Sequence, residues 1–332
     1  MSKNQIFNNT FTGERGYFGG STPVDTGRSL DAFLEATKFD YDVHKVQAVH
    51  PYKRDDSDKL VVIPNQFHLI NGNTDEVLSP MTVSDQYGVI SPRNIVESTR
   101  HLVDDGWATP DSLMRIRGGQ SEVLMLRLDG QTPAIKNNGV EEDWVWYLMI
   151  QNFHGRGKCR ARIIAKRPVC SNQIAGLMAD FDWAVSHRKN AAEKFENKVQ
   201  TWENLQNRLT VIAKKMGLYA DTTVDIPAVA REIVGIKSPE VGKTEAESNS
   251  TRKMNLLSAI IDGANMPNLG TFGRSAMDVY NSVTSFNTRG HEAVRSKLDA
   301  GQRAVRLIEG AGMSGHGLEM KTHKVLAGLV TA

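Results

Sequence analysis

The strongest constraint on the fold is one ten-residue stretch, Asp143–Asn152, which predicts a strand that is apolar on both faces. Successive side chains of a strand point to opposite faces. Two tryptophans and two aliphatic residues share one face here, and the residues between them, Val145, Tyr147 and Met149, share the other. A strand of this kind is covered on both sides. We therefore predict an α+β protein, with an antiparallel β-meander followed by a long helix and a mainly helical C-terminal part.

The next strand predicts a basic surface. His154-Gly155-Arg156-Gly157 is typical of a hairpin turn. In the returning strand, 158–167, alternation places Lys158, Arg160 and Arg162 on one face, at a repeat of about 7 Å. That repeat suits the phosphates of an extended nucleic-acid backbone. The alternative is a solvent-facing strand that carries three cations by chance.

Several neighbours extend this predicted site. The predicted nucleic-acid-binding residues are Arg156, Lys158, Arg160, Arg162, Lys166 and Arg167. Three aromatic side chains are candidates for base stacking, because every base offers a π-face: His154, Phe153 and Tyr147. The tryptophans Trp144 and Trp146 are expected in the core.

Three segments are expected along the chain. Residues 1–25 are rich in Gly, Asn and Thr and are typical of a flexible arm, and 26–220 form the α+β core with the basic hairpin. Residues 221–332 form a helical region with a polar linker near 237–252. Ser29 and Ser91 are predicted helix N-caps.

A long helical region is predicted after Cys170-Ser171-Asn172. Apolar residues recur there every seven residues at Phe195, Trp202, Leu209 and Met216, with Val199 between them. This seam packs either against the body of the chain or against another subunit. On the second interpretation, the partner is a further copy of the chain, in a ring or filament.

Composition limits the class of protein. The chain has 332 residues, of which 40% are hydrophobic and 23% are charged, and its formal net charge is +2. No apolar run reaches the roughly 20 residues of a membrane span. Charge is unevenly distributed: residues 31–150 hold 19 acidic and 11 basic residues, whereas residues 156–217 hold 5 acidic and 13 basic. This asymmetry predicts a positive face on a near-neutral body.

Motifs for catalysis or cofactor binding are not found. Gly242-Lys243-Thr244 lacks the earlier glycine and the leading strand of a phosphate-binding loop, so no ATP use is expected. His316, Glu319 and His323 are a weak match to a metal site. We predict no catalytic residues, no metal and no cofactor. A metal-dependent nuclease that uses dispersed carboxylates, such as Asp55, Asp56 and Asp58, is the weakest alternative.

Three ordered elements resemble a known family. They are Val83-Ser84-Asp85-Gln86-Tyr87-Gly88-Val89, Arg167-Pro168-Val169-Cys170-Ser171-Asn172 and the late helix Ala276–Thr284. Together they resemble the phage- and plasmid-encoded proteins grouped as domain of unknown function 932. The chain departs from that pattern at Tyr17-Phe18 and at Met277, where tryptophans are expected.

The resemblance implies that a mobile genetic element encodes the chain, but it implies no activity. The predicted layout is similar to that of single-strand annealing proteins of the RecT and Red-beta kind. The expected function is ATP-independent binding and annealing of single-stranded DNA in the host cell cytoplasm, by a homo-oligomer without membrane contact. The alternative is a phage structural or host-interaction protein that binds no nucleic acid.

Overall fold

The fold was analysed in a computed structural model of the whole chain. It describes residues 6–11, 22–23, 29–54, 57–116, 118–129, 132–137, 140–142, 144–155, 157–166, 183–199, 202–265, 274–289 and 313–330. Helices and antiparallel sheets are both present, which confirms the α+β class.

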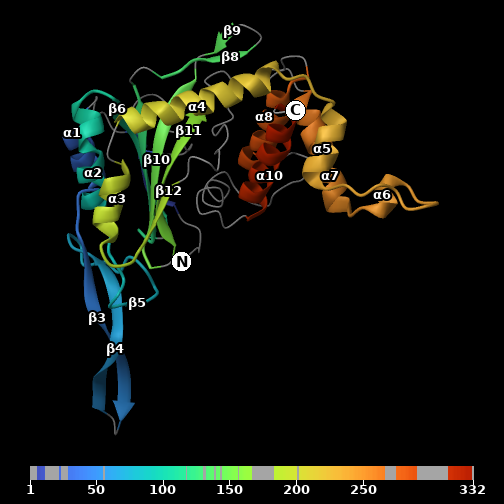
Figure 1. The fold of residues 1–332 in the computed structure, drawn as a ribbon. Coiled ribbons are helices and arrows are strands. Elements are labelled where there is room, and N and C mark those ends of the chain that lie inside the picture. Colours follow the sequence, from blue (N-terminus) through green and yellow to red (C-terminus); the bar gives the residue numbers. More distant parts are fainter. Residues whose placement is uncertain are drawn as a thin grey trace. The chain divides into compact units, whose positions relative to one another are not determined.

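The main feature is a seven-stranded sheet with the strand order β12-β11-β10-β7-β6-β1-β2 (Figure 1). Its strands are β1 (Ile6–Phe11), β2 (Thr22–Pro23), β6 (Ala108–Ile116), β7 (Ser121–Leu128), β10 (Val145–Phe153), β11 (Lys158–Lys166) and β12 (Trp183–Ser186). As predicted, β10 is an inner strand that is buried on both faces. Trp144 and Trp146 are in the core as expected.

Three helices cover one face of this sheet, as Figure 1 shows. They are α1 (Leu30–Thr37), α2 (Pro92–Asp104) and α3 (Ala191–Val199). The side chain of Ser29 accepts a hydrogen bond from the Ala32 amide, and Ser91 forms a reciprocal capping box with Asn94. Both predicted N-caps are therefore confirmed.

A long hairpin extends from the same unit (Figure 1). It consists of β3 (Val43–Arg54) and β4 (Ser57–Asn71), and the two-residue strand β5 (Val83–Ser84) pairs with the inner part of β4. Between Gln47 and Val49 the register shifts, so that β4 has extra residues around Pro64. The Gln47 side-chain amide donates to the carbonyl oxygens of Ile63 (2.6 Å) and Gln66 (3.0 Å), which closes this bulge.

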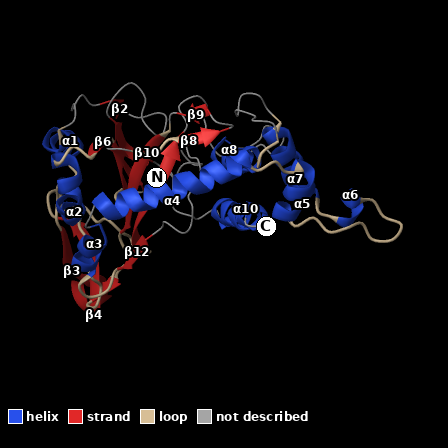
Figure 2. Ribbon diagram, turned by 45° about the horizontal axis from the view of Figure 1, so that its top comes forward, coloured by secondary structure: helices blue, strands red, loops and turns tan. Residues whose placement is uncertain are grey.

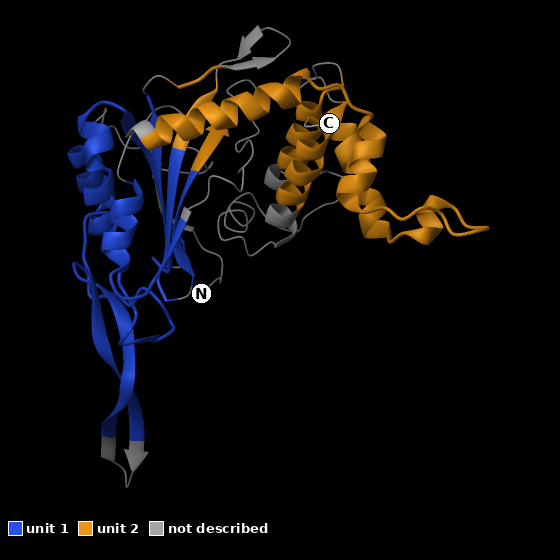
Figure 3. Ribbon diagram, in the orientation of Figure 1, with its two compact units in different colours: residues 1–130, 148–162, 183–202 blue, residues 131–147, 163–182, 203–332 orange. Residues whose placement is uncertain are grey.

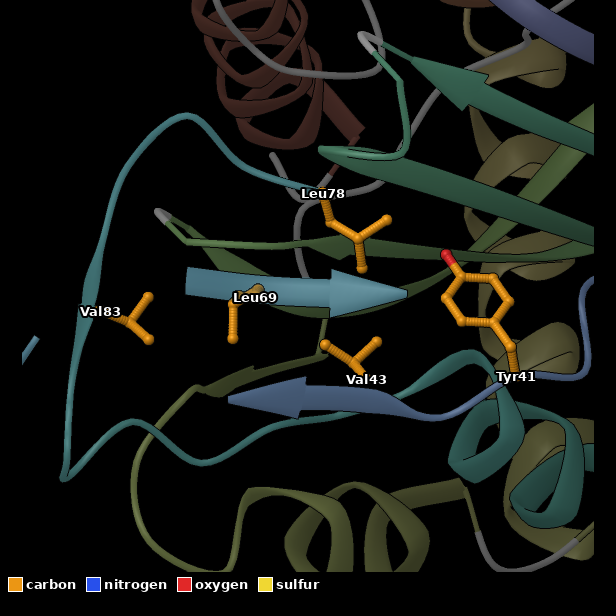
Figure 4. Packing of buried hydrophobic residues seen from close by; sticks show 5 residues of the cluster. All are labelled: Tyr41, Val43, Leu69, Leu78 and Val83. Atoms are coloured by element: carbon orange, nitrogen blue, oxygen red, sulfur yellow. The ribbon is translucent and has the colours of Figure 1, made fainter. Parts of the chain in front are cut away.

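The inner half of the hairpin has its own core (Figure 4). Val43 of β3 and Leu69 of β4 pack there with Tyr41, Leu78 and Val83. The segment that carries Leu78 and Val83 therefore covers one face of the hairpin at its base.

Some segments differ from the prediction. The predicted long helix is interrupted, because Trp183–Ser186 forms strand β12 and pairs with β11. Backbone hydrogen bonding along β11 outweighs local helical preference at these four residues. Ile6–Phe11, expected in a flexible arm, forms β1 against β6. The predicted polar loop 129–142 contains a short hairpin of β8 (Ile135–Asn137) and β9 (Val140–Glu142).

The chain divides into two compact units whose segments alternate along the sequence (Figure 3). Unit 1 comprises residues 1–130, 148–162 and 183–202, and unit 2 comprises 131–147, 163–182 and 203–332. The described part of unit 2 is mainly helical after residue 203 (Figure 2). Its helices are α4 (Trp202–Asp221), α5 (Ile226–Val234), α6 (Glu245–Ser248), α7 (Thr251–Ala264), α8 (Ala276–Arg289) and α10 (Met313–Val330).

The apolar seam predicted over 195–216 is largely buried in the chain itself. Phe195, Val199, Leu209 and Met216 have almost no exposed surface. The seam therefore serves as core, and these four residues offer no surface for contacts between subunits. Within the described residues, no helix has the length and apolar character needed to cross a bilayer.

Candidate nucleic-acid interface

Strand β11 carries the predicted cations, and its first four residues follow the expected alternation. Lys158 is exposed and Arg160 is half-buried, whereas Cys159 and Ala161 are fully buried. β11 pairs antiparallel with β12, which places Lys158 opposite Ser186 and Arg160 opposite Ala184. The two cations thus share a face beside the edge strand of the sheet.

The expected exposure of Arg162 is wrong. Its exposed fraction is 2%, and Ile163, Ile164 and Ala165 are buried with it. Beyond Ala161, β11 therefore resembles β10 in that both of its faces are covered. Side-chain alternation no longer separates an exposed face from a buried face there. The side chain of Lys166 and the residues Arg156 and Arg167 lie outside the described part of the structure.

The three aromatic candidates do not form an open stacking platform. Tyr147 and His154 are buried, and Phe153 is half-buried. Gly157 in the turn lies so close to the Phe153 ring that an added Cβ would be 3.0 Å from its Cγ. Tyr147 is buried because β10 is an inner strand with both faces covered, and His154 is buried directly after it, so neither ring is exposed for stacking in this structure.

His154 instead belongs to a buried polar network centred on Glu122 of β7. The Tyr41 hydroxyl donates to Glu122 Oε1 (2.7 Å), and Arg115 Nε donates to the same oxygen (3.1 Å). His154 Nε2 lies 3.3 Å from Glu122 Oε2. Burial, together with the Glu122 carboxylate, raises the pKa of Tyr41, so its hydroxyl keeps its proton. The network ties the start of the β10–β11 turn to β6 and β7.

A second set of contacts fixes the same end of the sheet. The Tyr87 ring stacks on His187 with the ring centroids 4.8 Å apart. The Gly155 amide donates to the Tyr87 hydroxyl (3.2 Å), and His187 Nδ1 lies 3.1 Å from the carbonyl oxygen of Gly88. Burial lowers the pKa of His187 to about 4, so the ring is neutral near pH 7 and Nδ1–H is the donor. Tyr87 and Gly88 thus join the β10–β11 turn to the turn after β12.

Gly88 makes this junction possible. A Cβ at position 88 would lie 1.9 Å from the carbonyl oxygen of Arg188. No other residue fits without moving the backbone of the turn at 187–190. The element Val83–Val89 therefore has a structural role: its Tyr87 and Gly88 hold two turns together.

Further cations follow β12, the strand that pairs with β11, and sequence reasoning had not assigned them to the site. Arg188 and Lys189 are exposed directly after β12, at the sheet end where Lys158 begins β11. Lys194 and Lys198 are exposed on α3, which packs on β12. We call this set the basic end: Lys158, Arg160, Arg188, Lys189, Lys194 and Lys198. The sequence signal that could have identified these additional cations is the high density of Lys and Arg at 188–198.

Few carboxylates oppose these charges. The segments 157–166 and 183–199 together contain two, Glu193 and Glu196, so the six cations of the basic end exceed them by four. Among the described residues, no cation of the basic end has a carboxylate within ion-pair distance. Lys194 Nζ donates to the carbonyl oxygen of Lys189 (3.2 Å). The basic end is therefore available for an anionic ligand.

Metal binding has no comparable support. The described residues contain no group of three or more His, Cys, Asp or Glu side chains placed to hold a metal ion. Glu319 is buried on α10, and His323 Nδ1 lies 2.6 Å from the hydroxyl of Tyr219. Cys159 is a buried free thiol whose pKa is raised by that burial, so it is a poor nucleophile.

Comparison with known proteins identifies the family. The family model described as Domain of unknown function (DUF932) matches residues 81–309. The matched range contains all three elements on which the resemblance was based, and also the basic end. Neither the curated proteins nor the solved structures contain a match to this chain. Because the matched range is more than half of the 332 residues, the chain belongs to the family Domain of unknown function (DUF932).

Proposed function

We propose that the protein binds single-stranded nucleic acid through the basic end, independently of base sequence. The observation that carries the proposal is the set of six exposed or half-buried cations on and next to the paired strands β11 and β12, which have no carboxylate partner among the described residues. Cations contribute to affinity by releasing counterions from phosphates, which requires no contact with bases. The burial of Tyr147 and His154 leaves backbone contacts as the main source of affinity.

Annealing of complementary strands, without ATP, is the process proposed for this binding. Its support is the similarity of the layout predicted from the sequence to that of RecT and Red-beta proteins, and the lack of a nucleotide-binding loop in the sequence. A phage or plasmid origin and action in the host cell cytoplasm belong to the same proposal.

The test is a titration of labelled oligonucleotides followed by fluorescence anisotropy. Lys158→Ala with Arg160→Ala, and separately Arg188→Ala with Lys189→Ala, should each weaken binding at least about tenfold, because each pair removes two phosphate contacts. The matched control is Lys214→Ala with Arg252→Ala, which removes two exposed cations of unit 2. Equal affinity of all three variants and the wild type would exclude the basic end as the binding surface.

A second candidate function has one specific observation in its favour. Six large apolar residues are exposed on β3 and β4: Val46, Val49, Tyr52, Leu60, Val61 and Val62. Such a surface is typical of a protein-interaction element. An interaction protein without nucleic-acid affinity would show no anisotropy change with single- or double-stranded oligonucleotides at low salt.

A further inference from the structure

Helices α5 and α10 of unit 2 pack side by side (Figure 1) and border an open hollow with a volume of about 410 Å³. Clefts of this size are typical of sites for small molecules. We call this one the α5–α10 hollow. Its lining consists of Glu232 from α5 and, from α10, Lys321, Lys324, Val325, Gly328 and Leu329.

Helix α10 has one face in the core of unit 2 and another face at the hollow. Thr322 and Leu326 have no exposed surface, so they belong to the inner face. Lys321, Lys324 and Gly328 are exposed. Residues three or four positions apart lie on the same side of a helix. The two lysines and the glycine therefore form a stripe that the core of the unit does not use.

One end of the hollow gathers ammonium groups near Gly235, the C-cap of α5. A Cβ at position 235 would lie 3.1 Å from Lys321 Nζ and 3.9 Å from Lys253 Nζ. Lys253 Nζ donates to the carbonyl oxygen of Gly235 (2.5 Å), which satisfies the end of the helix. Neither Lys321 nor Lys324 has an ion-pair partner or a side-chain hydrogen bond within the part of the chain that the structure describes. Capping of α5 thus accounts for Lys253 and leaves two cations for a ligand.

The lining offers three different kinds of contact. The two lysines supply charge and several N–H donors for a doubly charged phosphate. Val325 and Leu329, together with the bare backbone of Gly328, provide an apolar wall for a flat ring. Glu232 has no ion-pair partner among the described residues, and its carboxylate can accept hydrogen bonds from a hydroxyl or amino group.

A nucleoside monophosphate combines these three features in one small molecule. A fatty acid would leave Glu232 without a donor, and an inorganic anion would leave the apolar wall in contact with water. We infer that the α5–α10 hollow binds a nucleoside monophosphate, with the phosphate at Lys321 and Lys324 and the base against Val325 and Leu329. The inference goes beyond the proposed function and does not depend on it, because the hollow belongs to unit 2 and the basic end to unit 1.

The test is isothermal titration calorimetry of the full chain with adenosine monophosphate, at low ionic strength because salt screens exposed charges. We expect a Kd below about 1 mM. Adenosine, which lacks the phosphate, and inorganic phosphate, which lacks the nucleoside, should each bind at least about tenfold more weakly. The inference is overturned if adenosine monophosphate shows no saturable binding up to about 5 mM. Equal affinity for inorganic phosphate also overturns it, because the hollow would then be a site for anions alone.

Two variants change the hollow in different ways. Lys321→Ala with Lys324→Ala removes the cations and should raise the Kd for adenosine monophosphate at least about tenfold. Gly328→Leu fills the hollow, since an added Cβ there has no atom within 4 Å, and it should raise the same Kd at least about tenfold. Thermal unfolding followed by circular dichroism checks that both variants keep the fold. An unchanged Kd in either folded variant contradicts the inference.

The matched control is Lys158→Ala with Arg160→Ala, which removes two cations from the basic end. Its Kd for adenosine monophosphate should differ from that of the wild type by less than about threefold. Loss of binding in this variant would assign the nucleotide to the basic end and overturn the inference. Conversely, Lys321→Ala with Lys324→Ala should bind oligonucleotide as the wild type does. A wild type that binds adenosine monophosphate but no oligonucleotide would contradict the proposed function alone.

Discussion

At the scale of single residues, Glu122 has three side-chain partners to lose. Its buried carboxylate accepts hydrogen bonds from Tyr41 and Arg115 and contacts His154. Glu122→Ala should lower the free energy of unfolding by about 3–5 kcal/mol, because a partly buried guanidinium and a buried hydroxyl lose their acceptor. Glu122→Gln retains one carbonyl oxygen and should cost less, about 1–3 kcal/mol.

Urea unfolding, followed by the fluorescence of the buried tryptophans, measures the decrease in the free energy of unfolding for both Glu122 variants. Trp146 lies on β10 and Trp144 directly precedes it, and both are buried, so their fluorescence reports on unfolding of the seven-stranded sheet. If Glu122→Ala unfolds at the wild-type urea midpoint, the network does not hold the β10–β11 turn.

His187 makes the stability of unit 1 dependent on pH. In the folded chain its pKa is lowered to about 4, mainly by burial and further by His154, from 6.5 in the unfolded chain. Between these values the unfolded chain binds a proton that the folded chain does not. Stability therefore falls as the pH decreases from about 6.5 to about 4, by about 3 kcal/mol in all at 1.36 kcal/mol per unit.

The variant that checks this is His187→Phe, which keeps a flat ring against Tyr87 and cannot be protonated. Its urea midpoint should be lower than that of the wild type at pH 7, because the hydrogen bond to Gly88 is lost. The difference between the midpoints at pH 7 and pH 5 should be smaller than in the wild type. An unchanged difference would assign the acid sensitivity to another group.

At the scale of elements, the bulge at Gln47 divides the hairpin. The Gln47 amide holds two carbonyl oxygens of β4, those of Ile63 and Gln66. Gln47→Ala should loosen the outer part of the hairpin, because two backbone acceptors lose their donor, at a cost of about 1–3 kcal/mol. Faster amide exchange at residues 49, 50, 52 and 60–62, with unchanged exchange in β7 and β10, is the expected result. Uniform exchange across both sheets would show that the bulge is not a local boundary.

The elements differ in how well local sequence predicted them. The first two helices were predictable because their caps are local: Ser29 and Ser91 meet their amide partners three residues later. β10 was predictable because its apolar residues fill both faces. β12 was not predictable from its own four residues, since it exists only through pairing with β11.

The candidate site was predictable only in part, for the same reason. Alternation placed Lys158 and Arg160 correctly relative to Cys159. It could not show that β11 becomes buried on both faces at Arg162, because burial depends on residues distant in sequence. Arg188 and Lys189 join the site through the Tyr87–His187 junction, which connects segments about a hundred residues apart.

At the scale of the whole molecule, the proposed function predicts a definite dependence on salt. Six cations that neutralise six phosphates of a single strand give a slope of about −4 in a plot of log affinity against log salt, at about 0.7 per phosphate. Removing Lys158 and Arg160 should make the slope less steep by about 1.4. Anisotropy titrations between low and physiological salt measure the slope for the wild type and for the variant. A slope near zero would mean that any binding does not depend on these phosphate contacts.

The junction at Tyr87 and Gly88 also limits where this chain can contact a ligand. Both residues are committed to the chain's own backbone and to His187. They form a joint between two turns, so contacts with a ligand are left to the side chains that this joint carries outward.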